Sequence, residues 1–347
     1  MLVAEVVEVT DQLNDGYDVV VIGGGAAGLS GALMLARARR SVVVIDEGEP
    51  RNAPAEGVHG LLARDGMRPA ELLERGRAEV RGYGGQVASG EVGAVAREGD
   101  GFAVTLAGGR TVRARRLLVT TGLVDELPEI PGLRARWGRD VVHCPYCHGW
   151  EVRDQAIGVL ASSQLAVHQA LLFRQWSADV TLLSHTMPQP DGEEAEQLAA
   201  RGIRVVHGEV ASLEVVDDRL VGVRLTDGTV VGREVLAVSS RMVARAGFLA
   251  VLGLRPAEHP SGLGEHIPAD PAGRTDVPGV WVAGNVTDLA AQVGTAAAAG
   301  ATAAAQINAD LLAEETRQAV AARRDAFSAE SEARLCELVM SERRHGL

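Results

Sequence analysis

The chain has 347 residues, of which 46% are hydrophobic and 23% charged, and its formal net charge is −12. It contains no lysine, which excludes pyridoxal-phosphate enzymes, because they form a lysine Schiff base, and P-loop NTPases, because they need the Walker A lysine. The acidic balance also argues against a nucleic-acid binder, which would carry a basic face.

The predicted elements begin with a strand, a glycine turn, a helix and a second strand over residues 17–46. The β-branched run YDVVVI precedes three glycines, LSGALMLARAR has helical apolar spacing, and SVVVID has the pattern of a buried strand. Residues 66–84 predict a helix. Residues 86–120 predict a small antiparallel meander, and the buried strand LLVTTG ends this block.

A second block repeats the first. Shifted by 138 positions, IGVLASSQLAVHQALLFRQWSADVTLLS lies on VVVIGGGAAGLSGALMLARARRSVVVID without a gap. A helix over 193–202 and β runs over 209–231 follow, and REVLAVSS corresponds to RRLLVTTG. A duplication of this length predicts an α/β fold with two Rossmann-like, three-layer dinucleotide-binding domains.

A third segment, residues 275–313, predicts a strand in GVWVAG and a long Ala-rich helix. We expect residues 1–125 and 254–313 to form the first domain and residues 126–253 the second. The charged tail, residues 314–347, is compatible with a helix that is either solvated or covers a dimer partner.

The expected compartment is the cytoplasm, with no membrane contact. The first 18 residues carry five acids and no base, which does not fit a secretory signal. No apolar run reaches the length of a membrane span. Three cysteines, two of them close together, do not form a secreted disulfide framework.

A glycine motif indicates a nucleotide site in the first block. Gly23-x-Gly25-x-x-Gly28 follows a strand and opens a helix. Its glycines permit a tight turn, close approach of the backbone to a pyrophosphate, and close packing of helix on strand. The positive end of the helix dipole would face the diphosphate. Asp46 ends the second strand, where an acid accepts a hydrogen bond from a ribose hydroxyl.

Two further motifs carry a family resemblance. The run from Thr275 through Gly279 to Gly284 and Asn285 resembles the second FAD motif of the pyridine-nucleotide disulfide oxidoreductases, and Thr120-Thr121-Gly122 resembles their "ATG" turn. The resemblance covers residues 17–313 and implies FAD in the first site. The family usually has Asp where this chain has Asn285, whose carbonyl can still accept from a ribityl hydroxyl.

The same resemblance implies that the backbone of Gln292 and Val293, at the start of the last long helix, faces the flavin pyrimidine. The helix dipole there would stabilise negative charge on reduced flavin. The cofactor-binding residues expected from these motifs and their flanks are Gly23, Gly25, Ala26, Ala27, Gly28, Asp46, Glu47, Asn52, Thr121, Gly122, Gly284, Asn285, Gln292 and Val293.

The candidate redox centre is Cys144-Pro-Tyr-Cys147-His148, between the two blocks. Four interpretations are open for the cysteine pair. A zinc site would need further ligands, and His143 and His148 are nearby, but no second C-x-x-C exists. The string also matches the c-type haem signal, which needs a secretory route. The others are a buried structural pair and a redox-active dithiol; the adjacent predicted FAD site favours the dithiol.

The position of this motif, at the start of the second block, resembles the thioredoxin reductase branch, whose motif is C-x-x-C-D-G. The resemblance implies that Cys147 lies against the flavin and that Cys144 exchanges with substrate. His148 replaces the Asp and is placed to move protons near neutral pH, or else is a packing residue. We expect a structural role for His143 and an inert Cys336 on a tail helix.

The second block has lost the features that bind a nucleotide. The first two glycines correspond to Ala161 and Ser163, and Asp46 corresponds to Ser184. A Cβ at the first two positions would crowd a pyrophosphate. Residues 184–194 contain no Arg, although the family places several there to hold the 2′-phosphate of NADPH. We expect this unit to bind NADPH poorly or not at all; the alternative is a variant loop that still binds.

Taken together, the chain resembles the thioredoxin-reductase-like oxidases that close the disulfides of holomycin and gliotoxin. The resemblance implies a homodimeric FAD enzyme that oxidises a small dithiol to an intramolecular disulfide, with dioxygen as acceptor and hydrogen peroxide as product. Alternatives are a thioredoxin or disulfide reductase fed by NAD(P)H or ferredoxin, and a flavin-binding redox sensor. No metal, nucleic-acid or membrane partner is expected.

Overall fold

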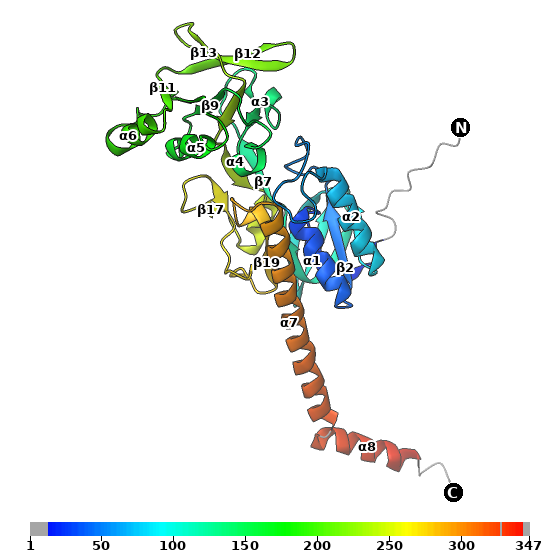
Figure 1. Cartoon of the computed structure of the whole chain (residues 1–347). Coiled ribbons are helices and arrows are strands. Elements are labelled where there is room, and N and C mark those ends of the chain that lie inside the picture. Colours follow the sequence, from blue (N-terminus) through cyan, green and yellow to red (C-terminus); the bar gives the residue numbers. More distant parts are fainter. Residues whose placement is uncertain (1–12, 327, 343–347) are drawn as a thin grey trace, which may run out of the picture.

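The computed structural model describes residues 13–326 and 328–342, and it contains two α/β units (Figure 1). The first unit is built on a seven-stranded sheet of order β3-β2-β1-β6-β5-β4, in which β19 also pairs with β6. Its strands are β1 (Gly16–Ile22), β2 (Val42–Asp46), β3 (Gln86–Ser89), β4 (Val92–Glu98), β5 (Gly101–Leu106), β6 (Thr111–Val119) and β19 (Val280–Val282). Its helices are α1 (Ala26–Arg37), α2 (Pro69–Gly82) and α7 (Val293–Ala326).

The second unit has a five-stranded sheet of order β11-β10-β9-β15-β8 and a three-stranded sheet β12-β13-β14. These strands are β8 (Val141–Val142), β9 (Ile157–Leu160), β10 (Val180–Leu183), β11 (Arg204–Val206), β12 (Val210–Val216), β13 (Arg219–Leu225), β14 (Val230–Val231) and β15 (Val235–Val238). The helices are α3 (Leu133–Arg136), α4 (Pro145–His148), α5 (Ala166–Phe173) and α6 (Gly192–Ala200).

Two short strands join the units. β7 and β16 carry the chain into and out of the second unit and pair with each other in antiparallel fashion, so both crossings lie side by side. The remaining elements are β7 (Leu123–Glu126), β16 (Arg241–Ala244), β17 (Ala257–Glu258), β18 (Glu265–His266), the 3₁₀ helices η2 (Gly247–Leu252) and η3 (Gly284–Val286), and α8 (Ala329–Glu342).

The predicted two-unit fold is confirmed, including the repeat. β1, α1 and β2 of the first unit correspond to β9, α5 and β10 of the second, and each strand pair is parallel. The predicted antiparallel meander over 86–120 is correct for β4, β5 and β6 but wrong for β3. β3 pairs in parallel with β2, because α2 is a crossover that returns the chain to the same end of the sheet.

The first sheet is buried on both faces, which explains its unbroken apolar strands. Val19 and Val21 of β1 pack in a cluster with α1 and α7, while Val20 and Ile22 pack in a second cluster with β4, β5 and β6. Successive side chains of a strand point to opposite faces, so a strand covered on both sides needs apolar residues at every position.

Helices α1 and α7 approach each other closely through glycine. A Cβ added at Gly300 of α7 would lie 1.9 Å from the carbonyl oxygen of Ala27 in α1, and one at Gly31 of α1 would lie 3.0 Å from the oxygen of Gly300. Any side chain at Gly300 would therefore force the two helices apart. The contact fixes where both helix N-termini lie.

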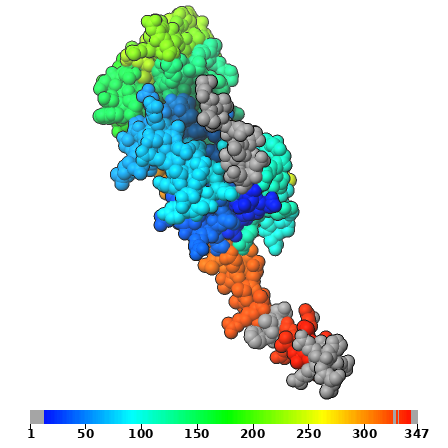
Figure 2. Space-filling view, turned by 90° about the vertical axis from the view of Figure 1, so that its right-hand side faces the viewer, coloured from blue at the N-terminus to red at the C-terminus, as the bar shows by residue number. Residues whose placement is uncertain are grey.

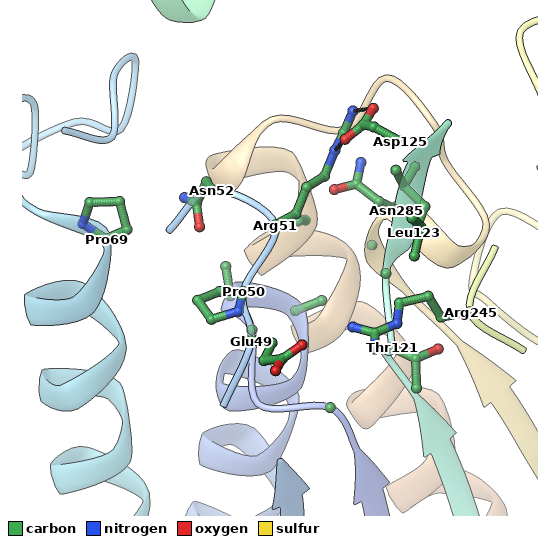
Figure 3. A pocket seen from close by; sticks show the side chains of 18 of the residues that line it. Glu49, Pro50, Arg51, Asn52, Pro69, Thr121, Leu123, Asp125, Arg245 and Asn285 are labelled. Carbon is green, nitrogen blue, oxygen red and sulfur yellow. Dashed lines mark hydrogen bonds and ion pairs between the residues drawn. The ribbon is translucent and has the colours of Figure 1, made fainter. Parts of the chain in front are cut away.

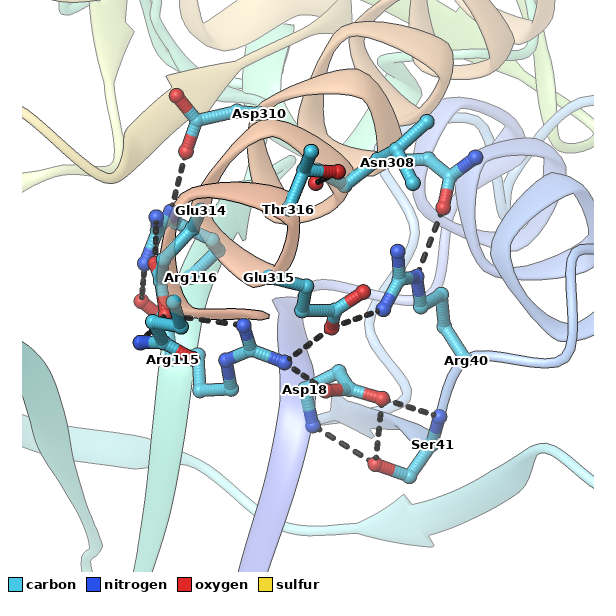
Figure 4. Close-up of polar contacts among 12 residues, drawn as sticks. Asp18, Arg40, Ser41, Arg115, Arg116, Asn308, Asp310, Glu314, Glu315 and Thr316 are labelled. Carbon is cyan, nitrogen blue, oxygen red and sulfur yellow. Dashed lines mark hydrogen bonds and ion pairs between the residues drawn. The ribbon is translucent and has the colours of Figure 1, made fainter. Parts of the chain in front are cut away.

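Beyond this contact, α7 leaves the body and continues as an arm that ends in α8 (Figures 1 and 2). Ion pairs anchor its root to β6: Arg115 contacts Glu314 at 2.9 Å and Glu315 at 2.7 Å, and Arg116 contacts Asp310 at 2.7 Å (Figure 4). The predicted boundary between residues 313 and 314 thus falls inside a continuous helix. The domain limits as a whole stay a prediction.

The tail cysteine lies on a helix, as expected: Cys336 is exposed on α8. None of the helices over residues 13–326 and 328–342 is long and apolar enough to span a membrane. The expectation about a secretory signal rests mainly on residues 1–12, which lie outside the described part of the chain.

We predict that Gly300→Ala lowers the free energy of unfolding by about 1–3 kcal/mol, because the new methyl group overpacks against the backbone of α1. Urea unfolding followed by circular dichroism measures the effect. Gly82→Ala in α2 is the matched control, since a Cβ there meets no atom within 4 Å; it should be neutral or slightly stabilising. Equal effects of the two substitutions would contradict the packing argument.

Candidate functional site

A cavity of about 800 Å³ opens at the carboxyl ends of β1, β2 and β6 (Figure 3). Ligands of open α/β sheets bind at this edge of the sheet. The expected residues that line it are Gly23, Gly25, Ala26, Ala27, Asp46, Glu47, Asn52, Thr121, Gly122, Cys144, Cys147, His148, Gly284, Asn285, Gln292 and Val293. One cavity therefore joins the nucleotide motif, the second motif and the cysteine pair.

Gly28 is the one expected cofactor residue that is not among those lining the cavity. A Cβ at Gly28 would lie 1.9 Å from the carbonyl oxygen of Gly23 and 2.6 Å from the hydroxyl of Thr120. Its role is thus to let α1 pack against the turn, and the glycines of this turn that line the cavity are Gly23, Gly24 and Gly25.

The turn before α1 fits a diphosphate. Gly25 is the N-cap of α1, no side chain caps the helix, and a Cβ at Gly25 would meet nothing within 4 Å. The cavity at this position therefore faces free backbone N–H groups and the positive end of the helix dipole.

Asp46 sits beside this turn. Its Oδ1 accepts a hydrogen bond from the N–H of Gly24 at 3.0 Å, and its Oδ2 lies 3.1 Å from Arg77 Nη2. The carboxylate is therefore held in one orientation at the cavity edge. The buried hydroxyl of Thr121 has no hydrogen-bond partner among the described residues, which suits contact with a polar ligand.

Asn285 organises the other end of the cavity. Its Nδ2 donates to the carbonyl oxygens of Asp288 at 3.0 Å and Ala291 at 3.0 Å, just before α7 begins at Val293. An Asp has no donor for these carbonyls. These loop carbonyls explain why the chain has Asn285 where the family usually has Asp. Oδ1 of Asn285 is left to accept a hydrogen bond from a ligand hydroxyl.

The cysteine pair lies at the start of the short helix α4. Cys144 is its N-cap residue and Pro145 its first helical residue, and the Sγ atoms of Cys144 and Cys147 are 2.7 Å apart. The two sulfurs are close enough to alternate between dithiol and disulfide without moving the helix. Both line the cavity, so the expected division of roles between them stays a prediction.

The reduced pair shares one proton unequally. The thiol of Cys147 donates to Cys144, and with backbone N–H groups this lowers the pKa of Cys144 to about 7 although burial opposes the shift. The same hydrogen bond, together with burial, raises the pKa of Cys147. Cys144 therefore carries the thiolate near neutral pH, which is the reactive form of a cysteine.

His148 ends α4 and faces the same cavity. Burial lowers its pKa, so the imidazole is neutral at pH 7, and its Nδ1 is buried without a hydrogen-bond partner among the described residues. A neutral imidazole with a free nitrogen can accept a proton. His143 differs, because its Nδ1 lies 3.1 Å from the carbonyl oxygen of Val238 in β15, a contact that suits the expected structural role.

The described residues of this site include no set of side chains arranged to bind a metal ion. No group of three or more His, Cys, Asp or Glu side chains within residues 13–326 and 328–342 is placed to hold a metal ion. The nearby histidines instead face separate partners: His143 contacts β15, and His59 lies 3.4 Å from Glu151.

Sequence reasoning missed two arginines in the cavity wall (Figure 3). Arg51 makes a bidentate contact with Asp125 of β7, at 2.6 and 2.7 Å. Burial acts to raise the pKa of Asp125, but the hydrogen bonds and charge of Arg51 bring it below its usual value. Arg245, after β16, pairs with Glu47. Both are isolated residues in loops, where no motif marks them.

In the second unit, the loop after β10 closes on the protein itself. His185 has a φ of 47°, and its Nδ1 accepts a hydrogen bond from the N–H of Val210 at 3.0 Å. Ser184 is buried, and none of Ala161, Ser163 and Ser184 is among the residues that line the cavity.

The chain matches the pyridine nucleotide-disulphide oxidoreductase family over residues 17–305. It is 32% identical over 308 residues to the protein named thioredoxin reductase tcpT from Claviceps purpurea, covering 86% of this chain and 95% of that one. It is 29% identical over 309 residues to the protein named thioredoxin reductase sirT from Leptosphaeria maculans, covering 84% and 93%.

Solved structures agree with this assignment. HlmI is 49% identical, with a TM-score of 0.85 over 91% of this chain and 99% of that one. An oxidoreductase from Agrobacterium tumefaciens is 36% identical, with a TM-score of 0.80 over 86% and 99%. Coverage of this extent includes residues of both units.

We predict that iodoacetamide alkylates Cys144 of the reduced protein with an apparent pKa of about 7. Cys147→Ala removes the donor that lowers this pKa, so the alkylation curve should move to higher pH. Both proteins carry Cys336→Ser, and peptide mass spectrometry measures the label on each cysteine. A curve that stays in place in Cys147→Ala would show that another group stabilises the thiolate.

Proposed function

The chain belongs to the pyridine nucleotide-disulphide oxidoreductase family, and from that premise we propose that it is an FAD-dependent dithiol oxidase. Its substrate would be a small dithiol of natural-product type, which it closes to an intramolecular disulfide. The observation that carries the proposal is an asymmetry between the units: Cys144 and Cys147 open on the cavity of the first unit, whereas the second unit lacks the features that hold NADPH.

The residues of the cavity support FAD as the cofactor. Gly25 and the N-terminus of α1 would hold the diphosphate, Asp46 a ribose hydroxyl, and Asn285 with the start of α7 the flavin end. When bound, FAD would take two electrons from the enzyme dithiol and pass them to dioxygen, which yields hydrogen peroxide.

The cysteines would oxidise the substrate in two exchanges. A substrate thiolate attacks Sγ of Cys144, the Cys144–Cys147 bond breaks, and Cys147 leaves as a thiolate. The second substrate thiolate attacks the substrate sulfur bonded to Cys144, so the cyclic disulfide departs and Cys144 leaves as a thiolate. Substrate loses two electrons and two protons: the electrons reduce the enzyme disulfide, Cys147 keeps one proton and the other passes to His148. The lowered pKa of Cys144 makes it a good leaving group in the second exchange.

His148 would take the protons from the substrate thiols. It is neutral near pH 7 because burial lowers its pKa, and its unpartnered Nδ1 is available to a thiol. Deprotonation matters because only the thiolate attacks a disulfide.

A disulfide reductase is the second candidate, because the relatives from Claviceps purpurea and Leptosphaeria maculans carry the name thioredoxin reductase. A reductase needs an entry point for electrons. Ala161 and Ser163 place side chains where a pyrophosphate would approach, and residues 184–194 offer no Arg to a 2′-phosphate. These features favour the oxidase.

We propose further that the protein is a cytoplasmic homodimer. Supporting the dimer, α8 exposes apolar side chains that a second copy would cover: Leu335 is 66% exposed, Leu338 61% and Met340 68%. Exposed apolar patches of this kind mark interaction surfaces.

We predict that the purified flavoprotein consumes one dioxygen and forms one hydrogen peroxide for each dithiothreitol that it converts to the cyclic disulfide. An oxygen electrode, a peroxidase-coupled assay and thiol titration measure the three quantities. Cys147→Ser should abolish the reaction, because no enzyme disulfide can form, whereas Cys336→Ser should leave it unchanged. Oxygen uptake that persists in Cys147→Ser would overturn the assignment.

A further inference from the structure

A loop of the first unit, residues 58–67, reaches the segment that follows α4, where His59 contacts Glu151. Val58 and Met67 form a bridge at its base, with the N–H of Val58 donating to the carbonyl of Met67 at 2.8 Å. Within the loop, the N–H of Gly60 donates to Asp65 at 3.0 Å. His59 is held between this loop and the second unit, and it lines the cavity together with His148.

His59 contacts a carboxylate on each side. Its Nδ1 lies 3.5 Å from Asp65 and its Nε2 lies 3.4 Å from Glu151. Along this row Glu151 is 38% exposed, the central His59 24% and Asp65, at the far end, 71%. The row therefore runs from the cavity wall to open solvent.

Glu151 connects His59 and Asp65 to His148. The N–H of Val152 donates to the carbonyl of His148 at 3.1 Å, so the helical turn of α4 continues past its end. Residues three apart on such a turn share a face, which places Glu151 beside His148. The buried Nδ1 of His148 has no hydrogen-bond partner among the described residues.

The proposed chemistry needs such a connection. Each substrate molecule delivers two protons to the active site; Cys147 keeps one of them in the reduced pair, where Cys144 is a thiolate, and His148 must pass the other to solvent. His148 is half-buried and faces the cavity that FAD and substrate would fill, so its proton would then need titratable neighbours that reach the surface.

We propose that Glu151, His59 and Asp65 form a path that carries protons from His148 to solvent. The inference rests on the proposed dithiol oxidation. Glu151 receives the proton from His148, His59 takes it from Glu151 through Nε2 and releases one from Nδ1 to Asp65, and water takes it from Asp65. No electrons move in this path, and each residue returns to its starting state.

Other charged groups also face His148 and its neighbours. Burial is the largest influence that lowers the pKa of His148; Glu151 acts to raise it and His59 to lower it. Arg51, from the loop after β2, acts on both cysteines, and His148 in turn acts on His143. Replacing Glu151 by Gln should therefore lower the pKa of His148.

Three readouts test the path in the purified full-length flavoprotein. Glu151→Gln and His59→Gln should slow anaerobic flavin reduction by dithiothreitol at pH 7 about tenfold in dilute buffer, less than the roughly 10²–10⁴-fold expected for loss of a general base itself, because His148 is retained. High imidazole should restore the rate, because a small buffer replaces the missing relay. NMR titration of labelled histidines should show a lower pKa for His148 in Glu151→Gln.

Glu193→Gln on α6 and His168→Gln on α5 are the controls, since both side chains are exposed on helices away from the cavity, and both should behave as the wild type. Slow reduction that imidazole does not restore, or an unchanged pKa of His148 in Glu151→Gln, would overturn the path. A wild type that dithiothreitol does not reduce would instead contradict the proposed function, and the NMR titration would still decide whether Glu151 couples to His148.

Discussion

The close approach of α1 to its glycine turn and to α7 is the contact on which the site depends. A Cβ at Gly28 or Gly300 would lie 1.9 Å from a backbone oxygen, so neither position tolerates a side chain without moving a helix. Because α1 is held there, its N-terminus and that of α7 reach the same cavity. Two positive helix ends then face this cavity, where the proposed FAD would place its diphosphate and its flavin.

The second unit keeps the same frame and uses it differently. β9, α5 and β10 repeat β1, α1 and β2, yet the loop after β10 bonds to β12 through His185. The unit thus acts as a support that presents α4 and its cysteines to the first unit. Arg51 and Asp125 join the two units beside the sulfurs. Under the proposed function, electrons would pass from substrate thiols through the cysteines to the flavin.

Much of this arrangement could be predicted from the sequence, because buried parallel strands and a Gly-x-Gly-x-x-Gly turn leave strong local patterns. The parallel pairing of β3 could not be predicted, because a short strand has the same sequence pattern in a parallel and in an antiparallel pair. The direction of β3 is set by α2, which returns the chain to the same end of the sheet. The sequence also carries no signal for Arg51, Arg245 and His59, because each is an isolated residue whose partner lies far along the chain. Gly28 does not line the cavity, and its close approach to the carbonyl of Gly23 agrees with the helix packing expected of the glycine motif.

The central claim is that this flavoprotein draws its electrons from a dithiol and not from a nicotinamide. The most direct measurement is rapid anaerobic mixing of the purified protein with NADPH and, separately, with dithiothreitol, while the flavin absorbance near 450 nm is followed. The account predicts rapid bleaching by the dithiol and little or none by NADPH. Rapid bleaching by NADPH would contradict it and would favour a reductase.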